Sequence, residues 1–142
     1  MANTTNRTFT IIKPDSVRKG NFGRIISRLE SEGFRVLGLK KVGLTRTQAE
    51  GFYGVHRERP FFTSLVEYMT SGPVFVAALE RDNAVKHLRD VMGATDPGKA
   101  DAGTIRKEFG ESIEQNAIHG SDSDENANIE IAFFFSGAEL LM

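Results

Sequence analysis

The sequence predicts an α+β fold of ferredoxin-like type, a split βαβ arrangement in which a four-stranded antiparallel sheet has helices on one face, together with additional helices and a long loop. The prediction depends on two observations. Strand-like apolar segments alternate with helix-like amphipathic segments, and the 142 residues contain no repeat, low-complexity tract or linker. Hydrophobic residues make up 39% of the chain, which argues against disorder. We therefore expect a single domain over residues 1–142.

Four segments have the character of strands. Residues 8–13 begin with alternating polar and apolar side chains and are followed by Pro14, which cannot donate a hydrogen bond within a sheet. Residues 34–44 and 73–80 are rich in apolar and β-branched side chains, and residues 116–119 form a weaker, short candidate. We expect the four segments to pair in one sheet.

Helix-like segments follow the first two strands, and their ends carry sequence signals. Asn21 and Gly33 are placed to begin and end a first amphipathic helix. Thr45 and Gln48 have the spacing of a capping box for a second helix. Pro60 suits the first position of a third, because that position needs no backbone N–H.

The second half of the chain predicts three more helices and a long loop. Asp82 and Gly93 are placed to cap and end the first of these helices, and residues 105–109 form a short second one. Asp122 and Glu125 have the spacing of a capping pair for the last helix. Residues 94–103 are rich in Pro, Gly and Asp without periodicity, and a loop of this length is often functional.

Composition excludes several classes of function. The formal net charge of −1 argues against a dedicated nucleic-acid or membrane-surface protein, so no stable partner of either kind is expected. There is no cysteine, which excludes thiol catalysis, disulfides and thiolate metal sites. Residues 1–6 lack the pattern of a signal peptide, and no apolar stretch reaches the roughly 20 residues that span a bilayer. A cytoplasmic protein is the expectation.

Several motifs come close to known sites and fail. Residues 93–100 nearly match a P-loop, but Ala100 replaces the hydroxyl that holds magnesium and Pro97 lacks an amide N–H. An acidic run resembles the opening of a calcium loop, but Ala127 stands where glycine is needed. Residues 50–55 echo an RNA-binding strand but begin with an acid and fall in a predicted helix. The histidines have no short-range spacing for zinc.

The segment of residues 116–123 carries the strongest chemical signal. His119 ends a short strand and is followed by glycine, two serines and a helix N-terminus, which suits an anion such as phosphate. A neutral imidazole nitrogen is a competent nucleophile when the other nitrogen is held by a hydrogen bond. Glu130 is the candidate holder, because helical spacing lets it point back toward the helix start. From the residues alone, an ordinary turn histidine remains the alternative.

Cations and an aromatic ring add weaker signals. Lys13, Arg89 and Arg106 lie at or near the ends of predicted elements, where they could neutralise phosphoryl oxygens, although each alone is better explained as a solvated surface charge. Phe61 and Phe62 follow a proline at helical spacing, so one is expected in the core and the other exposed. An exposed phenyl ring can stack on any nucleobase.

Six segments, distributed over nearly the whole chain, carry a family resemblance. The most specific is Asn116-Ala-Ile-His-Gly-Ser-Asp-Ser123. The supporting segments are Thr10-Ile-Ile-Lys-Pro-Asp15, Glu58-Arg-Pro-Phe-Phe62, Thr70-Ser-Gly-Pro73, Met92-Gly-Ala-Thr-Asp-Pro97 and Gly103-Thr-Ile-Arg106. Taken in order, these segments closely resemble the nucleoside diphosphate kinases, and the first is similar to the active-site signature of that family.

The resemblance implies a ping-pong phosphotransferase with a ferredoxin-like fold and low base specificity. A nucleoside triphosphate, as its Mg²⁺ complex, would give its terminal phosphoryl group to His119, and a nucleoside diphosphate would then accept it. The matching positions imply roles for further residues: Ser121 and Glu130 position His119, Tyr53 lies beside the reacting phosphate, Phe61 stacks on the base, Lys13 and Asn116 bind ribose and phosphates, and Arg89, Thr95 and Arg106 hold the phosphates. The family forms homo-oligomers, tetramers or hexamers.

Two other functions compete with this one. A nucleic-acid-binding module on the same kind of sheet would need exposed aromatic residues on central strands and a basic face, which the net charge disfavours. A regulatory relative that binds nucleotide without turnover is disfavoured because the motif residues are present.

Overall fold

The computed structural model describes residues 6–141, and the expectation drawn from the amino-terminal segment depends mainly on residues 1–5, which lie outside this range. No helix within the described range is long and apolar enough to cross a membrane. The elements are β1 (Arg7–Ile12), α1 (Pro14–Arg18), α2 (Phe22–Ser31), β2 (Arg35–Val42), α3 (Arg46–Phe52), α4 (Phe62–Met69), β3 (Val74–Glu80), α5 (Ala84–Met92), α6 (Ile105–Phe109), β4 (Ile118–Gly120) and α7 (Asp124–Phe134), with short 3-10 helices at Gly54–His56, Pro97–Lys99 and Gly137–Glu139.

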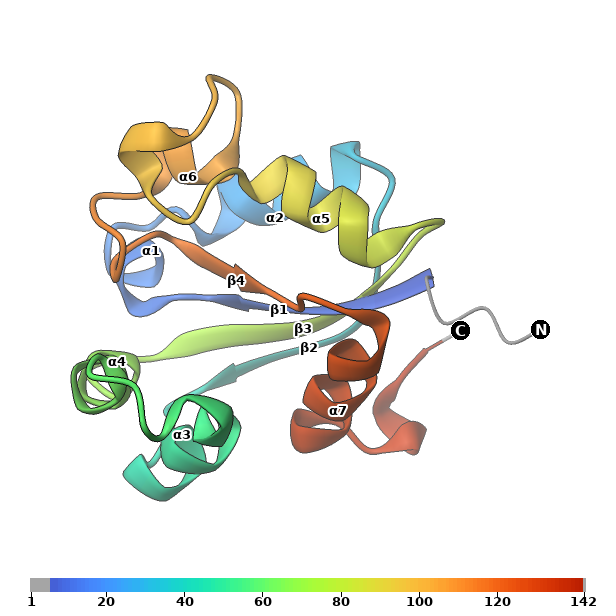
Figure 1. The fold of residues 1–142 in the computed structure, drawn as a ribbon. Helices are drawn as coiled ribbons and strands as arrows, with labels where there is room; N and C mark the ends of the chain where they lie inside the picture. The colour runs from blue at the N-terminus through green and yellow to red at the C-terminus, as the bar shows by residue number, and fades with distance from the viewer. Residues whose placement is uncertain (1–5, 142) are drawn as a thin grey trace.

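The sheet has the topology that the sequence predicts. Its four strands lie in the order β2-β3-β1-β4, and every neighbouring pair is antiparallel (Figure 1). The strand β3 therefore separates β1 from β2, which is the split βαβ arrangement. The short strand β4 pairs with β1 alone and places His119 opposite Ile11.

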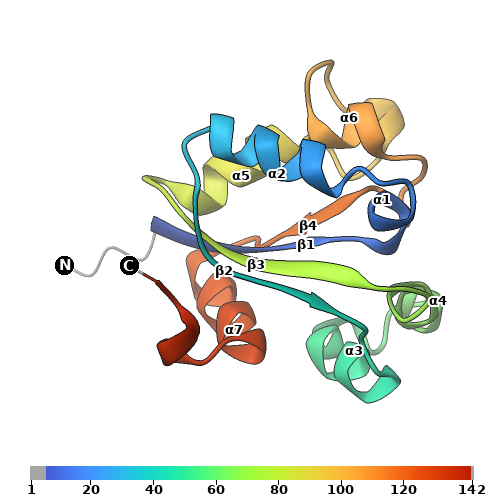
Figure 2. The same cartoon turned by 180° about the vertical axis from the view of Figure 1, so that it is seen from behind.

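Helices pack on both faces of this sheet. The helices α2, α5 and α6 form the layer that was expected on one face, and the additional helices α3, α4 and α7 cover the opposite face (Figures 1 and 2). Each face has its own apolar core: one joins Leu29 and Leu88 to the sheet residue Leu79, and the other joins Met69 and Ile131 to sheet residues such as Phe9.

The predicted starts of two helices are confirmed, that of α3 by its hydrogen bonds and that of α6 by its bounds. At α3 the capping box is complete, because the Thr45 hydroxyl accepts from the Gln48 amide at 3.1 Å and the Gln48 side chain accepts from the Thr45 amide at 2.9 Å. The short helix α6 spans residues 105–109 as predicted.

Two other caps were predicted at the wrong residue. The cap of α5 is Asn83, in the left-handed conformation at a φ of 55°, and not Asp82. Asparagine tolerates this conformation better than most residues. The cap of α7 is Ser123, whose hydroxyl accepts from the Asn126 amide at 3.0 Å, and not Asp122. In both cases the N-cap position lies one residue further on, and only Ser123 makes a side-chain cap there.

The remaining boundaries differ by small shifts. Pro60 lies before α4, which begins at Phe62, and Asn21 precedes α2 but makes no side-chain cap. The strand β4 begins at Ile118 because Ala117, at a φ of 77°, interrupts the extended chain.

Candidate active site

His119 is held at its Nε2 atom, while its other ring nitrogen has no hydrogen-bond partner among the described residues. The Nε2 atom lies 2.9 Å from Oε1 of Glu130, and 23% of the His119 side chain is exposed. An ionised carboxylate only accepts hydrogen bonds, so beside ionised Glu130 a neutral imidazole carries its hydrogen on Nε2. The lone pair of the ring then lies on Nδ1, which makes no hydrogen bond to residues 6–141.

Glu130 is itself fixed by a second contact. The hydroxyl of Ser121 donates to Oε1 of Glu130 at 2.8 Å and accepts from the backbone amide of Phe9 at 3.3 Å. Because Phe9 lies on β1 and Glu130 on α7, this chain of hydrogen bonds ties the helix to the sheet. The structure thus brings together the three residues that the sequence associates with orienting the imidazole: His119, Glu130 and Ser121.

Three aromatic rings lie close to the imidazole. The ring centroids of Phe9, Phe52 and Tyr53 lie 6.2, 5.6 and 6.4 Å from that of His119. Tyr53 is buried, and burial together with the charge of Glu130 raises the pKa of its phenol above the usual range, so it stays protonated. The sequence does not identify the part played by Phe9 and Phe52, because ring contacts between distant segments leave no local signal.

A buried clamp holds the strained residue that precedes the β4 strand. The amide of Ala117 donates to Oδ2 of Asp15 at 3.1 Å, and its carbonyl accepts from the Lys13 amide at 2.9 Å. Asp15 is fully buried and also accepts a hydrogen bond from the hydroxyl of Tyr68. A non-glycine residue in the left-handed region is unfavourable, and these contacts compensate for it. Sequence reasoning missed this clamp.

Lys13 reaches the same region from the end of β1. Its Nζ atom donates to Oδ1 of Asn116 at 2.8 Å and to the carbonyl of Glu114 at 3.0 Å. The side-chain amide of Asn116 donates in turn to the carbonyl of Thr95 at 3.0 Å. Burial, and then the neighbouring charge of Arg106, lowers the pKa of Lys13 to about 8. Lys13, Asn116 and Thr95 are therefore linked by hydrogen bonds between their segments.

The two arginines are placed differently. Arg106 is buried, and its guanidinium donates to the carbonyls of Gly93 at 3.2 Å and Ile118 at 2.7 Å, while its buried Nε has no partner among the described residues. Burial and the charge of Arg89 lower its pKa to about 10. Arg89 is exposed and lines a separate shallow depression with residues such as Ser123. Its charge is near enough to act on Arg106, but it does not line the pocket described below.

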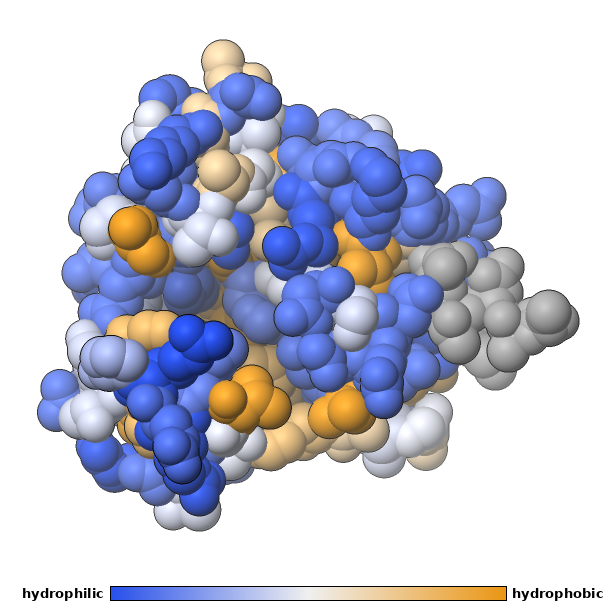
Figure 3. Space-filling model, viewed as in Figure 1, coloured by the Kyte–Doolittle hydropathy of each residue, from blue (hydrophilic) through white to orange (hydrophobic). Residues whose placement is uncertain are grey.

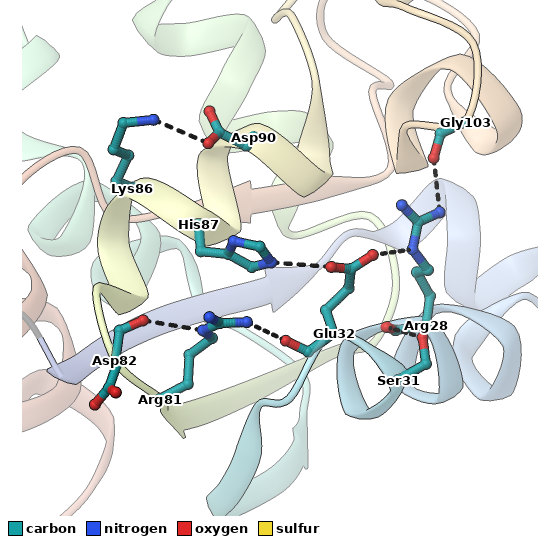
Figure 4. Close-up of polar contacts among 9 residues, drawn as sticks. All are labelled: Arg28, Ser31, Glu32, Arg81, Asp82, Lys86, His87, Asp90 and Gly103. Carbon is teal, nitrogen blue, oxygen red and sulfur yellow. Dashed lines mark hydrogen bonds and ion pairs between the residues drawn. The ribbon is translucent and has the colours of Figure 1, made fainter.

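The segment that carries Arg106 is anchored from α2 (Figure 4). One guanidinium nitrogen of Arg28 donates to the carbonyl of Gly103 at 2.6 Å, and its Nε pairs with Glu32 at 3.1 Å. The other carboxylate oxygen of Glu32 lies 2.9 Å from Nε2 of His87, on α5. Gly103 directly precedes the residue that caps α6, so this network fixes the start of the helix on which Arg106 lies.

One pocket of about 350 Å³ is lined by His119 and Glu130 together with Tyr53, Lys13, Asn116, Thr95 and Arg106. Figure 3 shows the surface hollowed between the side of α6 and the side of α3 and α4. Phe61 and Ile113 contribute exposed apolar walls, with 46% and 61% of each residue exposed, whereas Phe62 packs against the core. Residues that line the pocket without having been predicted are Phe52, Val55, His56, Leu65, Ile113, Glu114 and Ile118.

The motifs that the sequence rejected have ordinary structural roles. Residues 93–96 of the P-loop-like segment directly follow the helix α5, where a P-loop would follow a strand. The calcium-like segment forms the first turns of α7. Within residues 6–141, no three His, Cys, Asp or Glu side chains are grouped so that they could hold a metal ion.

The chain is similar to known proteins over most of its length. The sequence model of the family described as "Nucleoside diphosphate kinase" matches residues 6–140. Two proteins called nucleoside diphosphate kinase are similar over most of both chains. The one from Granulibacter bethesdensis is 61% identical, with 95% of this chain and 96% of the relative covered. The one from Rhizorhabdus wittichii is 60% identical, with 96% and 98% covered.

Solved structures extend the likeness to the fold. The nucleoside diphosphate kinase of Aquifex aeolicus superposes with a TM-score of 0.94 at 47% identity, covering 96% of this chain and 99% of that one. The halophilic enzyme of Halobacterium salinarum, in complex with CDP, superposes with a TM-score of 0.93 at 41% identity, covering 97% and 92%. On these likenesses over nearly its whole length, the chain belongs to the nucleoside diphosphate kinase family and is a phosphotransferase with the activity of that family.

Proposed function

We propose that Nδ1 of His119 carries the phosphoryl group between nucleotides. The hydrogen bond between Nε2 and Glu130 is the observation that supports this most directly, because it leaves the lone pair on Nδ1. In the first half-reaction Nδ1 forms a bond to the terminal phosphorus of a nucleoside triphosphate. The bond from that phosphorus to the bridging oxygen breaks, and the diphosphate leaves with its electron pair. In the second half-reaction a terminal oxygen of another diphosphate attacks the phosphorus, and the electron pair returns to Nδ1.

The imidazole needs a partner that stabilises positive charge while the phosphohistidine forms. Glu130 accepts the Nε2 hydrogen throughout, and Ser121 keeps Glu130 in place. Tyr53, buried beside the imidazole and held in its protonated form, would donate to an oxygen of the transferring group. These residues position and polarise the reactants, which is most of what phosphoryl transfer requires of a protein.

Cations on the other walls of the pocket would bind the phosphates and the ribose. Lys13 and Asn116, already joined by a hydrogen bond, would hold the ribose hydroxyls and a phosphate. Arg106 and Thr95 would hold the phosphates from the loop side, and Arg89 would approach from outside the pocket. The nucleotide enters as its Mg²⁺ complex, since the described residues form no carboxylate cluster of their own and magnesium readily binds phosphates.

The base would lie between the two exposed apolar walls. Phe61 on the α4 side and Ile113 on the opposite side both line the pocket. Stacking on a phenyl ring is tolerant of base identity, because every base has a π-face. The CDP complex of the Halobacterium salinarum relative supports nucleotide binding in this fold. A cytoplasmic location, where nucleoside di- and triphosphates are plentiful, belongs to the same proposal.

We also propose that the chain forms a homo-oligomer, a tetramer or a hexamer. The strand β2 lies at one edge of the sheet, and its residue Leu39 is 43% exposed. An exposed strand edge with an apolar side chain favours association. Light scattering coupled to size exclusion should give the mass of four or six chains, and the mass of one chain would contradict this part of the proposal.

The His119→Ala variant tests the proposal. Wild-type protein incubated with ATP labelled in the terminal phosphate should acquire acid-labile, base-stable label, and a coupled assay should show conversion of a nucleoside diphosphate. Both should disappear in His119→Ala, and Glu130→Gln should lower kcat by about 100-fold, since it removes the charge opposite the imidazolium-like product. Transfer by His119→Ala at a rate near that of the wild type would refute the proposed mechanism.

A further inference from the structure

Ala117 lies, in a strained conformation, between a residue proposed to bind the nucleotide and the nucleophile. Its φ of 77° is in the left-handed region, which is unfavourable for a residue with a Cβ atom, and strain of this kind is typical of active sites. Asn116 precedes it and accepts a hydrogen bond from Lys13, whereas His119 follows two residues later on β4. The backbone angle at Ala117 therefore decides how Asn116 and Lys13 are oriented relative to His119.

Both polar atoms of the Ala117 backbone are held by the segment that follows β1. Its amide donates to Oδ2 of Asp15 at 3.1 Å, and its carbonyl accepts from the backbone amide of Lys13 at 2.9 Å. The second of these contacts is between two backbone groups, whereas the first depends on where a side chain lies. The left-handed conformation of Ala117 therefore depends on the carboxylate of Asp15 staying in place.

The hydroxyl of Tyr68, on α4, holds this carboxylate. It donates to Oδ1 of Asp15 and accepts from the backbone amide of Asp15 at 2.7 Å. Burial, and then the hydrogen bond to Asp15, raises the pKa of the Tyr68 phenol above its usual range, so the hydroxyl keeps the hydrogen that it donates. The Tyr68 ring centroid also lies 6.0 Å from Nζ of Lys13. Tyr68 thus acts on both sides of the site without lining the pocket.

We propose, resting on the function proposed above, that Tyr68 is a positioning residue for phosphoryl transfer, which keeps Ala117 left-handed through Asp15 and so aligns His119 with the bound phosphate. Without the hydroxyl, Ala117 relaxes toward a negative φ, the region that alanine prefers. The nucleophile is then misaligned, although every group that binds the nucleotide is still present. Misalignment of this kind lowers kcat and leaves KM almost unchanged.

Tyr68→Phe tests this role, because it removes the hydroxyl and keeps the ring beside Lys13. It should lower kcat by about tenfold, the effect of one hydrogen bond to a charged group, with KM within about twofold of the wild type. Each chain should still take up as much label from ATP as the wild type, only more slowly. Ser16→Ala is the matched control: it removes a fully buried hydroxyl next to Asp15 that has no hydrogen-bond partner within residues 6–141, and kcat should not change. A wild-type kcat in Tyr68→Phe would overturn the inference.

Ala117→Gly separates positioning from a contribution to stability alone. Glycine adopts a φ of 77° without strain, so this variant should keep kcat within about threefold of the wild type. In its background Tyr68→Phe should lower kcat by less than about threefold, since the hydroxyl no longer has a strained residue to hold.

A hydroxyl that only stabilised the fold would have the same effect in both backgrounds, so an equal loss of kcat would overturn the inference. A loss of more than about threefold in Ala117→Gly alone would overturn it as well, because the conformation at residue 117 would not be what matters. If Tyr68→Phe alone does not fold, the double variant compared with Ala117→Gly decides in the same way. Label on the wild type and its absence from His119→Ala show separately whether the proposed function holds.

Discussion

At the scale of single residues, the site depends on buried charged groups. Lys13 is almost fully buried, and its ammonium is held by two oxygen acceptors that carry no charge. Burial disfavours the charged form, which is why its pKa falls to about 8. An arriving phosphate would favour the ammonium again. Lys13 is thus positioned to bind an anion, and it loses part of that ability when the pH rises.

The affinity of the free enzyme for nucleotide should therefore fall above pH 8. Below the pKa of Lys13 the ammonium is present and phosphates are bound. Above it the free enzyme loses the proton, so kcat/KM should fall by about tenfold for each further pH unit. Arg106, with a pKa of about 10, stays protonated at the start of this range. The measurement is the pH profile of kcat/KM with one nucleotide pair.

The Lys13→Arg variant is the control for this profile. A guanidinium stays protonated throughout the range, so the variant should have a lower kcat/KM overall but no decline beginning near pH 8. A decline of the same shape in the variant would assign the titration to another group.

At the scale of elements, the loop between α5 and α6 needs restraints from outside itself. The helix α6 has five residues, too few to be stable alone. Thr104 caps it, Arg28 holds the carbonyl of Gly103, and Glu32 holds Arg28 (Figure 4). Arg106 lies on this helix. The contacts between α2 and the loop therefore act on the phosphate side of the pocket indirectly, through the position of Arg106.

Replacing Arg28 should therefore weaken nucleotide binding more than it slows transfer. Arg28→Gln removes the contact with Gly103 and should raise KM by about threefold, while kcat changes little. This rise is smaller than the loss of a buried, charged hydrogen bond would cause, because the side chain of Arg28 is partly exposed. Hydrogen exchange at residues 103–106 should become faster. Arg46→Gln is the matched control, since it breaks an ion pair of the same helical spacing with Glu50 and leaves the loop untouched. Equal effects of the two substitutions would show that the loop does not depend on Arg28.

The capping residues show the limit of local prediction at this scale. The Thr45–Gln48 pair was predicted and is present, because its two hydrogen bonds involve residues three apart. Asp122 and Asp82 were predicted as caps with equal reason, but each is followed by another residue that also suits the position. The choice between neighbours depends on the backbone angles that tertiary packing imposes, which the local sequence does not contain.

At the scale of the whole molecule, the alternation of segments was enough to predict the sheet and its topology. What the sequence could not supply are the contacts between distant segments. Asp15 and Tyr68 lie far apart in the chain and meet only because α4 packs near the end of β1, where they support the strained Ala117. Their side chains show no periodicity or motif that predicts this pairing.

The site was predicted unevenly for the same reason. Glu130 could be placed near His119 because the helix that carries it starts only a few residues after the histidine, and the structure confirms their contact. The sequence did not indicate Glu114 as a pocket residue. Its contact with Ser64 joins distant segments and depends on the packing of α4 against the segment of Glu114. Arg89 lies on α5 and lines a depression outside the pocket, which its position in the sequence does not indicate.

The most direct test of the account is to locate the phosphorus on the phosphorylated protein. A chain with isotope-labelled histidine nitrogens, phosphorylated by ATP and kept at alkaline pH, should show phosphorus–nitrogen coupling in NMR at Nδ1 of His119, while Nε2 keeps its hydrogen toward Glu130. Coupling at Nε2, or phosphorus on any other residue, would contradict the claim that Glu130 directs the reaction to one nitrogen of the imidazole.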